Sequence, residues 1–178
     1  MIRLFVGLSV PEDIAEELAD LADNMPGARW IEPQNMHVTL RFIGEVSETV
    51  AEDIHHELAR VTSKPFAYEG LGLETFGQGF KAHALIMRVS LTPELEILQG
   101  RVESAVARTG QPREARKFKP HITLARLKDS NPDRVQQFIA AHNLFRAGPV
   151  GVDHFILYES KMGKSGSAYF PLAEYPIS

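Results

Sequence analysis

One four-residue pattern occurs twice in this chain and constrains its fold more than any other feature. The pattern is His, an aliphatic residue, Thr and Leu, and it reads "HVTL" at 37–40 and "HITL" at 121–124. Nearly half of the 178-residue chain separates the two copies. We therefore expect an internal duplication in which each half of the fold supplies one copy.

Hydrophobic periodicity predicts alternating strands and helices in the first part of the chain. Aliphatic residues predict strands at 2–8 and 36–46. Apolar residues at helical spacing predict helices at 11–25 and 47–62. The first helix is expected to end at Pro26 and Gly27.

The second part repeats this order with different spacing. Strands are expected at 66–76, 83–90 and 119–127, with helices at 92–110 and 131–143. Thr92 and Asn131, each followed by Pro, are the predicted N-caps of these helices. Residues 152–160 and 167–175 are expected to form a hairpin. The expected fold is α+β, in which two similar lobes of mainly antiparallel strands with flanking helices surround a central cleft, in one domain spanning 1–178.

The composition excludes several kinds of site. The chain has no cysteine, which excludes a disulfide framework, a cysteine-based zinc site and a thiol nucleophile. No apolar run approaches the ~20 residues needed to cross a bilayer. The start "MIRLFVGLSVPED" lacks the features of a secretory leader, so we interpret it as a first strand. We expect a cytoplasmic protein with no membrane association.

The net charge of −4 is unevenly distributed. Residues 1–60 carry twelve acidic and four basic side chains, whereas 101–128 carry eight basic and two acidic ones. The basic run "REARKFK" at 113–119 directly precedes the second motif. This run fits a phosphate-bearing ligand, although a solvated loop with a few salt bridges explains it equally well.

Side chains of a strand alternate between its two faces, and both motifs follow that alternation. In the first copy, the predicted polar face is formed by His37, Thr39 and Arg41. The predicted core face is formed by Met36, Val38, Leu40 and Phe42. In the second copy, His121 and Thr123 form the predicted polar face, and Ile122 and Leu124 form the predicted core face. A single motif of this kind is most simply an amphipathic strand whose polar face meets water. Two copies in a duplicated fold would instead face each other across a groove.

Two facing histidines can perform acid and base catalysis. An ordinary imidazole pKa of ~6.5 lets one ring act as a base while the other acts as an acid near neutral pH. A bound phosphate favours that division because the anion stabilises one imidazolium. The threonine hydroxyls can donate hydrogen bonds to phosphate oxygens. The pattern therefore predicts acid/base catalysis at phosphorus without a metal or a cofactor.

Two competing sites are less well supported by the sequence. Zinc needs three or four ligands, and each motif supplies one histidine without a matching Asp, Glu or Cys. A serine hydrolase would need a G-x-S-x-G turn, which the chain lacks. Of the remaining histidines, His83, His142 and His154 are expected to be structural. His55 and His56 are adjacent on a predicted helix and point about 100° apart, so they are poorly placed to chelate a metal.

The motifs and their flanks resemble a known family. "NMHVTLRFIGEV", "FKPHITLAR", "LFVGLSVPED", "RWIEPQNMH" and "LYESKMGKSGSAYFPL" are similar to the bacterial and archaeal RNA 2′,3′-cyclic phosphodiesterases, also called 2′-5′ RNA ligases, of the 2H phosphoesterase superfamily. The resemblance covers almost the whole chain. It implies a bilobal α+β fold and metal-independent hydrolysis of terminal RNA 2′,3′-cyclic phosphate to a 2′-phosphate.

The resemblance also implies roles for individual residues. His37 matches the proton donor to the leaving 3′ oxygen, and His121 matches the acceptor that activates water. Thr39 and Thr123 match the phosphate-holding hydroxyls. Arg126 matches a further phosphate or cleft residue, but strict alternation puts it on the opposite face unless the strand ends or bulges before it.

Two features depart from the family or lie outside its signature. Arg41 is not part of that signature, although alternation makes it a candidate phosphate ligand. The middle strand "HALIMRV" lacks a tryptophan found in many relatives. Contacts to the base or ribose of the substrate therefore do not follow from the resemblance.

Several functions remain open at the level of sequence. The substrate is expected to be an RNA end or nucleotide with a 2′,3′-cyclic phosphate, and the chain is expected to act as a monomer without an obligate protein partner. Alternatives are 2′-5′ RNA ligation, hydrolysis of small cyclic nucleotides or of 2′-5′ oligonucleotides, and a non-catalytic RNA- or nucleotide-binding module. Intact His and Thr in both motifs argue against the last of these.

Overall fold

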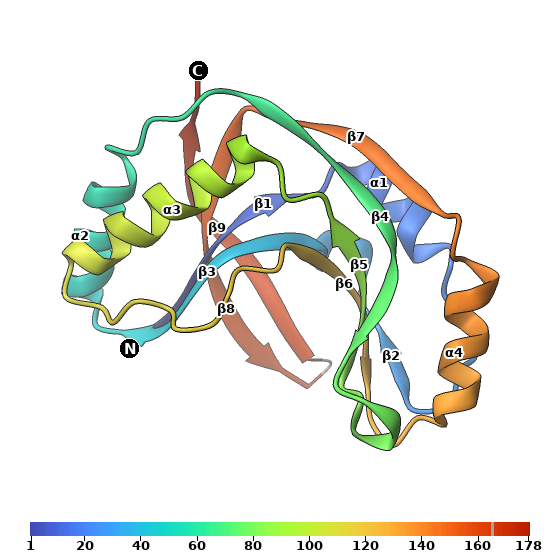
Figure 1. Ribbon diagram of the computed structural model, residues 1–178. Coiled ribbons are helices and arrows are strands. Elements are labelled where there is room, and N and C mark those ends of the chain that lie inside the picture. Colours follow the sequence, from blue (N-terminus) through green and yellow to red (C-terminus); the bar gives the residue numbers. More distant parts are fainter. Residues whose placement is uncertain (165) are drawn as a thin grey trace.

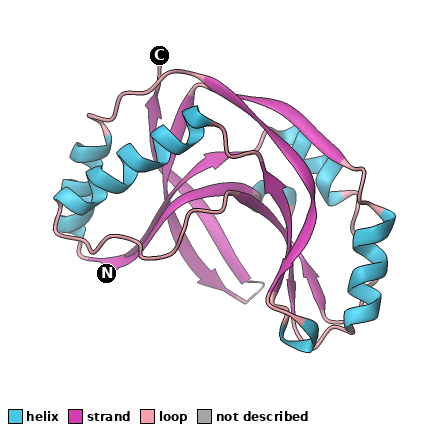
Figure 2. Ribbon diagram, in the orientation of Figure 1, coloured by secondary structure: helices cyan, strands magenta, loops and turns pink. Residues whose placement is uncertain are grey.

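The computed structural model describes residues 1–164 and 166–178. The strands are β1 (Ile2–Ser9), β2 (Ala28–Trp30), β3 (His37–Val46), β4 (Phe66–Phe76), β5 (Ala84–Val89), β6 (His121–Leu127), β7 (Arg146–Val152), β8 (His154–Gly163) and β9 (Gly166–Pro176). The helices are α1 (Glu12–Ala19), α2 (Glu48–Leu58), α3 (Pro93–Arg108) and α4 (Pro132–Ala141), with 3-10 turns η1 (Pro33–Asn35) and η2 (Gly79–Lys81). Figure 1 shows their arrangement and Figure 2 separates helices from strands.

The described strands form one nine-stranded sheet in which the pairings are antiparallel. Its order is β7-β4-β5-β6-β3-β1-β8-β9, and β2 pairs with β6 outside this path. The two motif strands, β3 and β6, are neighbours at the centre, with three strands of the path on either side of the pair. The α+β class and the antiparallel sheet expected from the sequence are confirmed.

The helices tie the two halves of the sheet together. In Figure 1, α2 and α3 lie on the left and α1 and α4 on the right. Helix α1 follows β1 but contacts β7 in the other half, and α3 follows β5 but contacts β3. Each half of the sheet is therefore covered partly by a helix from the other half.

The apolar faces of the motif strands lie in the main core. Val38 and Ile122 are fully buried, and Leu40 and Leu124 are nearly so. Each fully buried aliphatic side chain contributes roughly 1.5–3 kcal/mol relative to an exposed one. A one-residue slip of either strand would exchange these leucines for His and Thr, so the core fixes the register of the motifs.

The helix starts follow the predicted caps. The side chain of Thr92 accepts a hydrogen bond from the Leu95 amide at 3.2 Å, and that of Asn131 accepts one from the Asp133 amide at 2.9 Å. Both caps precede a proline at the start of the helix. These contacts confirm the expected N-termini of α3 and α4.

Several elements differ from the sequence prediction, and two of the differences have a clear local cause. Helix α1 ends at Ala19 and not near Met25, because a turn follows in which the Asp23 carboxylate accepts a hydrogen bond from the Met25 amide at 2.9 Å. Strand β7 is not among the strands expected from the sequence; it contains Gly148, Pro149 and Gly151. It lies at an edge of the sheet, where a proline removes no hydrogen bond from the interior of the ladder.

Candidate active site

The two motifs meet at one antiparallel contact in the centre of the sheet. Val38 of β3 pairs with Ile122 of β6. In an antiparallel pair a local two-fold axis passes between opposed residues, so it relates His37 to His121 and Thr39 to Thr123. All four of these polar side chains are partly exposed, whereas Val38 and Ile122 point into the core. The structure thus brings both predicted His–Thr pairs to one face of the sheet.

Both imidazoles are oriented in the same way. The Nδ1 atom of His37 lies 2.9 Å from the Asn35 carbonyl oxygen, and that of His121 lies 2.7 Å from the Lys119 carbonyl oxygen. A carbonyl can only accept, so Nδ1 carries a hydrogen in each ring and Nε2 of the neutral ring has a free lone pair. In His37, Nε2 accepts from the Thr39 hydroxyl at 3.0 Å. The backbone therefore fixes the ring nitrogen that can exchange a proton with a ligand.

The surroundings of the two rings differ. His37 is packed among aromatic rings: the centroids of Phe5, Tyr169 and Tyr158 lie 4.7, 5.0 and 6.1 Å from its own. His121 meets the edge of one ring, that of Phe76, at 4.7 Å. Next to it are charged groups, with the Lys119 Nζ atom 4.0 Å from a Glu74 carboxylate oxygen.

Burial makes both imidazoles weak bases. It lowers the pKa of His37 from 6.5 to about 4, an effect that the Asn35 carbonyl opposes and the positive charges of His121 and Arg126 reinforce. Burial also lowers the pKa of His121; the Lys119 carbonyl and Glu74 raise it, while Arg126 and the Lys119 ammonium lower it further. At pH 7 both rings of the ligand-free protein are therefore neutral.

A bulge follows each motif and reverses the alternation. Val6 of β1 pairs with Arg41 and Gly7 pairs with Thr39, which leaves Leu40 as the extra residue in β3. In the same way Leu85 of β5 pairs with Ala125 and Ile86 pairs with Thr123, which leaves Leu124 as the extra residue in β6. An extra residue shifts everything after it to the opposite face.

The bulges decide where the two predicted arginines lie. Arg126 is exposed, and its charge lowers the pKa of both His37 and His121, so it lies near both rings. The bulge before Arg126 allows this position, which strict alternation would not. The predicted position of Arg41 beside Thr39 is wrong, because the side chain is 7% exposed and lies on the core face. Phe42 was expected in the core and is instead 44% exposed.

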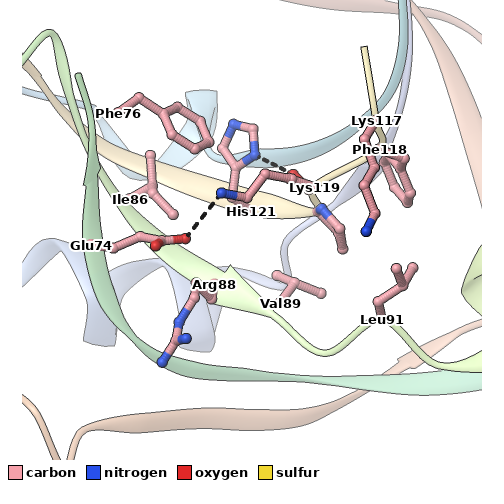
Figure 3. Close-up of a pocket in the computed structure, with 11 residues that line it drawn as sticks. Glu74, Phe76, Ile86, Arg88, Val89, Leu91, Lys117, Phe118, Lys119 and His121 are labelled. Atoms are coloured by element: carbon pink, nitrogen blue, oxygen red, sulfur yellow. Dashed lines mark hydrogen bonds and ion pairs between the residues drawn. The ribbon is translucent and has the colours of Figure 1, made fainter.

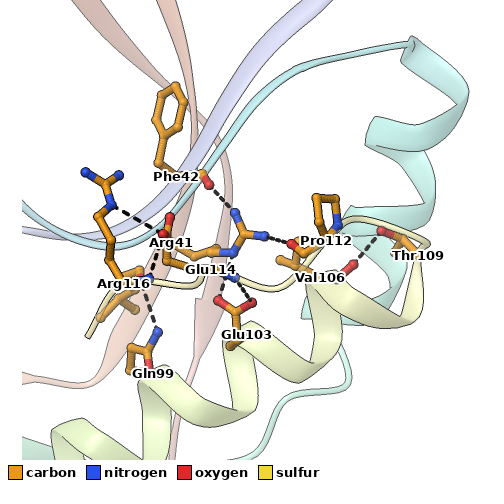
Figure 4. A network of polar contacts seen from close by, with 10 residues as sticks. Arg41, Phe42, Gln99, Glu103, Val106, Thr109, Pro112, Glu114 and Arg116 are labelled. Atoms are coloured by element: carbon orange, nitrogen blue, oxygen red, sulfur yellow. Dashed lines mark hydrogen bonds and ion pairs between the residues drawn. The ribbon is translucent and has the colours of Figure 1, made fainter. Parts of the chain in front are cut away.

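Arg41 forms a buried network on the other side of the sheet (Figure 4). Its Nε lies 2.8 Å from a Glu103 carboxylate oxygen of α3, and its terminal nitrogens donate to the carbonyls of Phe42 and Pro112. The other Glu103 oxygen accepts from the Glu114 amide at 3.0 Å. Arg41 thus attaches the loop before the second motif to β3 and α3.

A pocket opens beside His121 (Figure 3). It is lined by Glu74, Phe76, Ile86, Arg88, Val89, Leu91, Lys117, Phe118, Lys119, Pro120 and His121. Arg88 pairs directly with His121 across β5 and β6. The sequence analysis did not identify Glu74 or Arg88, because their proximity to His121 depends on the pairing of strands that are distant in sequence.

His55, His56 and His154 have their polar partners outside the two motifs. His55 Nδ1 lies 2.9 Å from the Tyr175 hydroxyl, and His154 Nδ1 lies 2.6 Å from an Asp153 carboxylate oxygen. His56 is exposed on α2. Within 1–164 and 166–178, no three His, Cys, Asp or Glu residues are grouped in a way that could hold a metal ion. None of the helices in these residues is long and apolar enough to cross a membrane.

Comparison with known proteins identifies the family. The family model of the 2′-5′ RNA ligase superfamily matches residues 10–163. Curated relatives named RNA 2′,3′-cyclic phosphodiesterase are 30% identical in Bacillus subtilis, over 90% of this chain and 89% of the relative, and 33% identical in Aeropyrum pernix, over 82% and 84%. The crystal structure of Escherichia coli LigT with 3′-AMP has a TM-score of 0.78 at 24% identity, covering 99% of this chain and 98% of that chain. The chain belongs to the 2′-5′ RNA ligase superfamily.

Proposed function

We propose that this chain is an RNA 2′,3′-cyclic phosphodiesterase that hydrolyses the terminal cyclic phosphate to a 2′-phosphomonoester by a two-histidine mechanism. The observation that carries the proposal is the pair of imidazoles at the centre of the sheet, each held through Nδ1 and each with Nε2 available. The names of the curated relatives support the same reaction. We propose that it needs no metal or cofactor, because the imidazoles and hydroxyls supply the proton transfers and the phosphate contacts.

The reaction follows from the placement of the two rings on either side of a bound phosphorus. His121 Nε2 accepts a proton from water as the water oxygen bonds to phosphorus. The bond from phosphorus to O3′ breaks on the opposite side, and O3′ takes a proton from Nε2 of protonated His37. The phosphate stays on O2′, and solvent restores the two protonation states.

The acid must acquire its proton together with the substrate. His37 is neutral in the ligand-free protein at pH 7, and a cyclic phosphate carries one negative charge that favours the imidazolium. Protonation of Nε2 also frees the Thr39 hydroxyl hydrogen, which His37 holds in the absence of ligand, for a phosphate oxygen. We assign Thr39, Thr123 and Arg126 to phosphate binding, and we withdraw Arg41 because it lies on the core face.

The direct test uses an oligoribonucleotide ending in 2′,3′-cyclic phosphate, incubated with the protein in EDTA. We expect a 2′-phosphate end and a loss of at least ~10²–10⁴-fold in kcat for His37→Ala and for His121→Ala. His56→Ala is the matched control, because His56 is exposed on α2. Activity that EDTA abolishes, or either site variant within a few-fold of wild type, would contradict the mechanism.

The two roles can be separated with a substrate that has sulfur in place of O3′. A thiolate leaves without protonation, so the general acid becomes unnecessary. The loss in His37→Ala should then shrink to a few-fold, while the loss in His121→Ala persists. The opposite pattern would assign the acid to His121.

Each active site needs one chain, because both motifs come from the same sheet. We therefore propose a monomer that acts on RNA ends in the cytoplasm without an obligate protein partner. Sedimentation at concentrations used in the assay tests the monomer. Activity per chain that rises with protein concentration would contradict it.

A further inference from the structure

Arg126 has a second arginine next to it on the face of the sheet that carries both motif histidines. Arg29 of β2 pairs with Arg126 of β6, and the opposed residues of an antiparallel pair project from the same face with Cα atoms about 4.5–5.5 Å apart. Trp30 pairs with Ala125, which is fully buried, so these next residues belong to the core face. Arg29 is exposed, and the two-histidine mechanism does not use it.

Arg29 and Arg126 line one pocket together with residues of η1 and β9. Its lining also includes Glu32, Asn35, Ser167 and Tyr169. The Asn35 side-chain amide donates a hydrogen bond to the Ser167 carbonyl at 3.4 Å, and this contact holds β9 beside η1. Two guanidinium groups and one carboxylate in the lining leave a net positive charge, so the pocket favours an anion.

This pocket lies on the side of His37. The Asn35 carbonyl oxygen accepts the Nδ1 hydrogen of His37, and the Tyr169 ring centroid lies 5.0 Å from that of His37. In the proposed reaction His37 protonates the leaving O3′. The nucleoside that carries the cyclic phosphate therefore lies on this side, whereas the attacking water lies on the side of His121. The pocket adjoins the nucleoside and not the nucleophile.

RNA ends and free nucleotides differ in charge on this side of the reacting phosphate. A nucleoside 2′,3′-cyclic phosphate carries one negative charge, whereas the same nucleoside at an RNA end carries a second one, on the phosphodiester at O5′. One ribose separates the two phosphorus atoms, and one strand spacing separates Arg126 from Arg29. Two cations at this spacing match two phosphates joined by one ribose. Arginine binds such oxygens through charge-assisted hydrogen bonds, which are roughly twice as strong as neutral ones.

We infer that Arg29 binds the phosphodiester at O5′ of the terminal nucleotide and thereby selects RNA ends over free nucleoside 2′,3′-cyclic phosphates. This inference rests on the proposed function and on its assignment of His37 to the nucleoside side. Arg126 binds the phosphate that reacts, and Arg29 binds the neighbouring phosphate that does not. Arg29 therefore determines the preference for an RNA chain and takes no part in proton transfer.

The test compares two substrates that differ only in the second phosphate. One is adenosine 2′,3′-cyclic phosphate, and the other is the same nucleoside with a methyl phosphodiester at O5′, which has the charge of an RNA linkage. The ratio of kcat/KM for the second substrate to kcat/KM for the first is measured with each protein. In wild type the methyl phosphodiester should raise kcat/KM about tenfold or more, which corresponds to about 1.4 kcal/mol.

Three variants assign this ratio to Arg29. In Arg29→Gln the ratio should fall to within about twofold of unity, whereas Arg29→Lys should keep part of it, because the charge remains without the planar guanidinium. Arg60→Gln is the matched control, since Arg60 is an exposed arginine that pairs with Glu57 of α2 outside the pocket lining. This control should leave the ratio within about twofold of the wild-type value.

Each outcome has a distinct meaning. A wild-type ratio near unity, or a ratio that Arg29→Gln leaves intact, would overturn the phosphodiester site while leaving the phosphodiesterase in place. An equal loss of kcat/KM for both substrates in Arg29→Gln would also overturn it, because Arg29 would then be a further ligand of the cyclic phosphate. Absence of hydrolysis of both substrates by wild-type protein would contradict the proposed function itself.

Discussion

Acid should destabilise this protein through His37 in a way that can be measured. The unfolded chain binds a proton on this imidazole near pH 6.5, whereas the folded protein resists it until about pH 4. Above pH 6.5 both states are neutral there, and His37 contributes no pH dependence. Between pH 6.5 and 4 the unfolded state binds more protons, so the free energy of unfolding falls as the pH falls.

The magnitude follows from the two pKa values. The pKa of His37 is 6.5 in the unfolded chain and about 4 in the folded protein, and each pH unit between them corresponds to about 1.36 kcal/mol. The free energy of unfolding should therefore be about 3 kcal/mol lower at pH 4. His37→Gln removes the titration and keeps a polar side chain of similar size. The free energy of unfolding of wild type minus that of His37→Gln should therefore fall by about 3 kcal/mol between pH 7 and pH 4.

Urea unfolding of both proteins across this range measures the difference. Other titrating groups contribute equally to both proteins, except through the charge of His121, whose own pKa burial also lowers. A difference that stays constant within about 1 kcal/mol would refute the reasoning, since it would mean that the folded protein protonates His37 near its ordinary pKa. Inorganic phosphate should reduce the loss at pH 4, because a bound anion favours the imidazolium.

Two further predictions concern stability away from the histidines. Arg41→Met should lower the free energy of unfolding by ~3–5 kcal/mol, because Glu103 would remain buried without its partner at 2.8 Å. The double variant Arg41→Met, Glu103→Met should recover most of that loss in the same denaturant assay. Gly27→Ala should lower the free energy of unfolding by more than ~1 kcal/mol, since φ is +80° and a Cβ would lie 2.4 Å from the Lys128 carbonyl oxygen. Gly100→Ala in α3 has open space around it and should raise the free energy of unfolding by ~0.4–1 kcal/mol. Equal effects of the two alanines would contradict this account.

Sequence alone predicted the faces of the motif strands as far as Thr39 and Thr123. Alternation needs only local geometry, and the buried Val38 and Ile122 hold both strands in that register. The prediction failed at Arg41, because the preceding Leu40 is an extra residue relative to β1. A bulge depends on the neighbouring strand, and nothing in "HVTLRF" distinguishes a bulged strand from a regular one.

The equivalent bulge at Leu124 explains why strict alternation and the family resemblance give different positions for Arg126. Strict alternation excluded Arg126 from the site and included Arg41, and both placements are reversed in the structure. The equivalent bulges at Leu40 and Leu124 show that the duplication extends to an irregularity of the strands. Phe42 and Arg126 occupy equivalent positions after the first and the second motif. The two-fold relation therefore places an aromatic ring beyond the first motif and a cation beyond the second.

That difference illustrates how a duplicated motif can become an asymmetric site. The local two-fold axis between Val38 and Ile122 makes the two imidazoles equivalent in backbone position, tautomer and carbonyl partner. Their unlike properties come from neighbouring strands: β1, β8 and β9 bring aromatic rings to His37, whereas β4 and β5 bring Glu74 and Arg88 to the side of His121. In the proposed mechanism the motif therefore supplies two equivalent proton carriers, and the strands around them determine which one is next to the nucleoside and which one is next to the nucleophile.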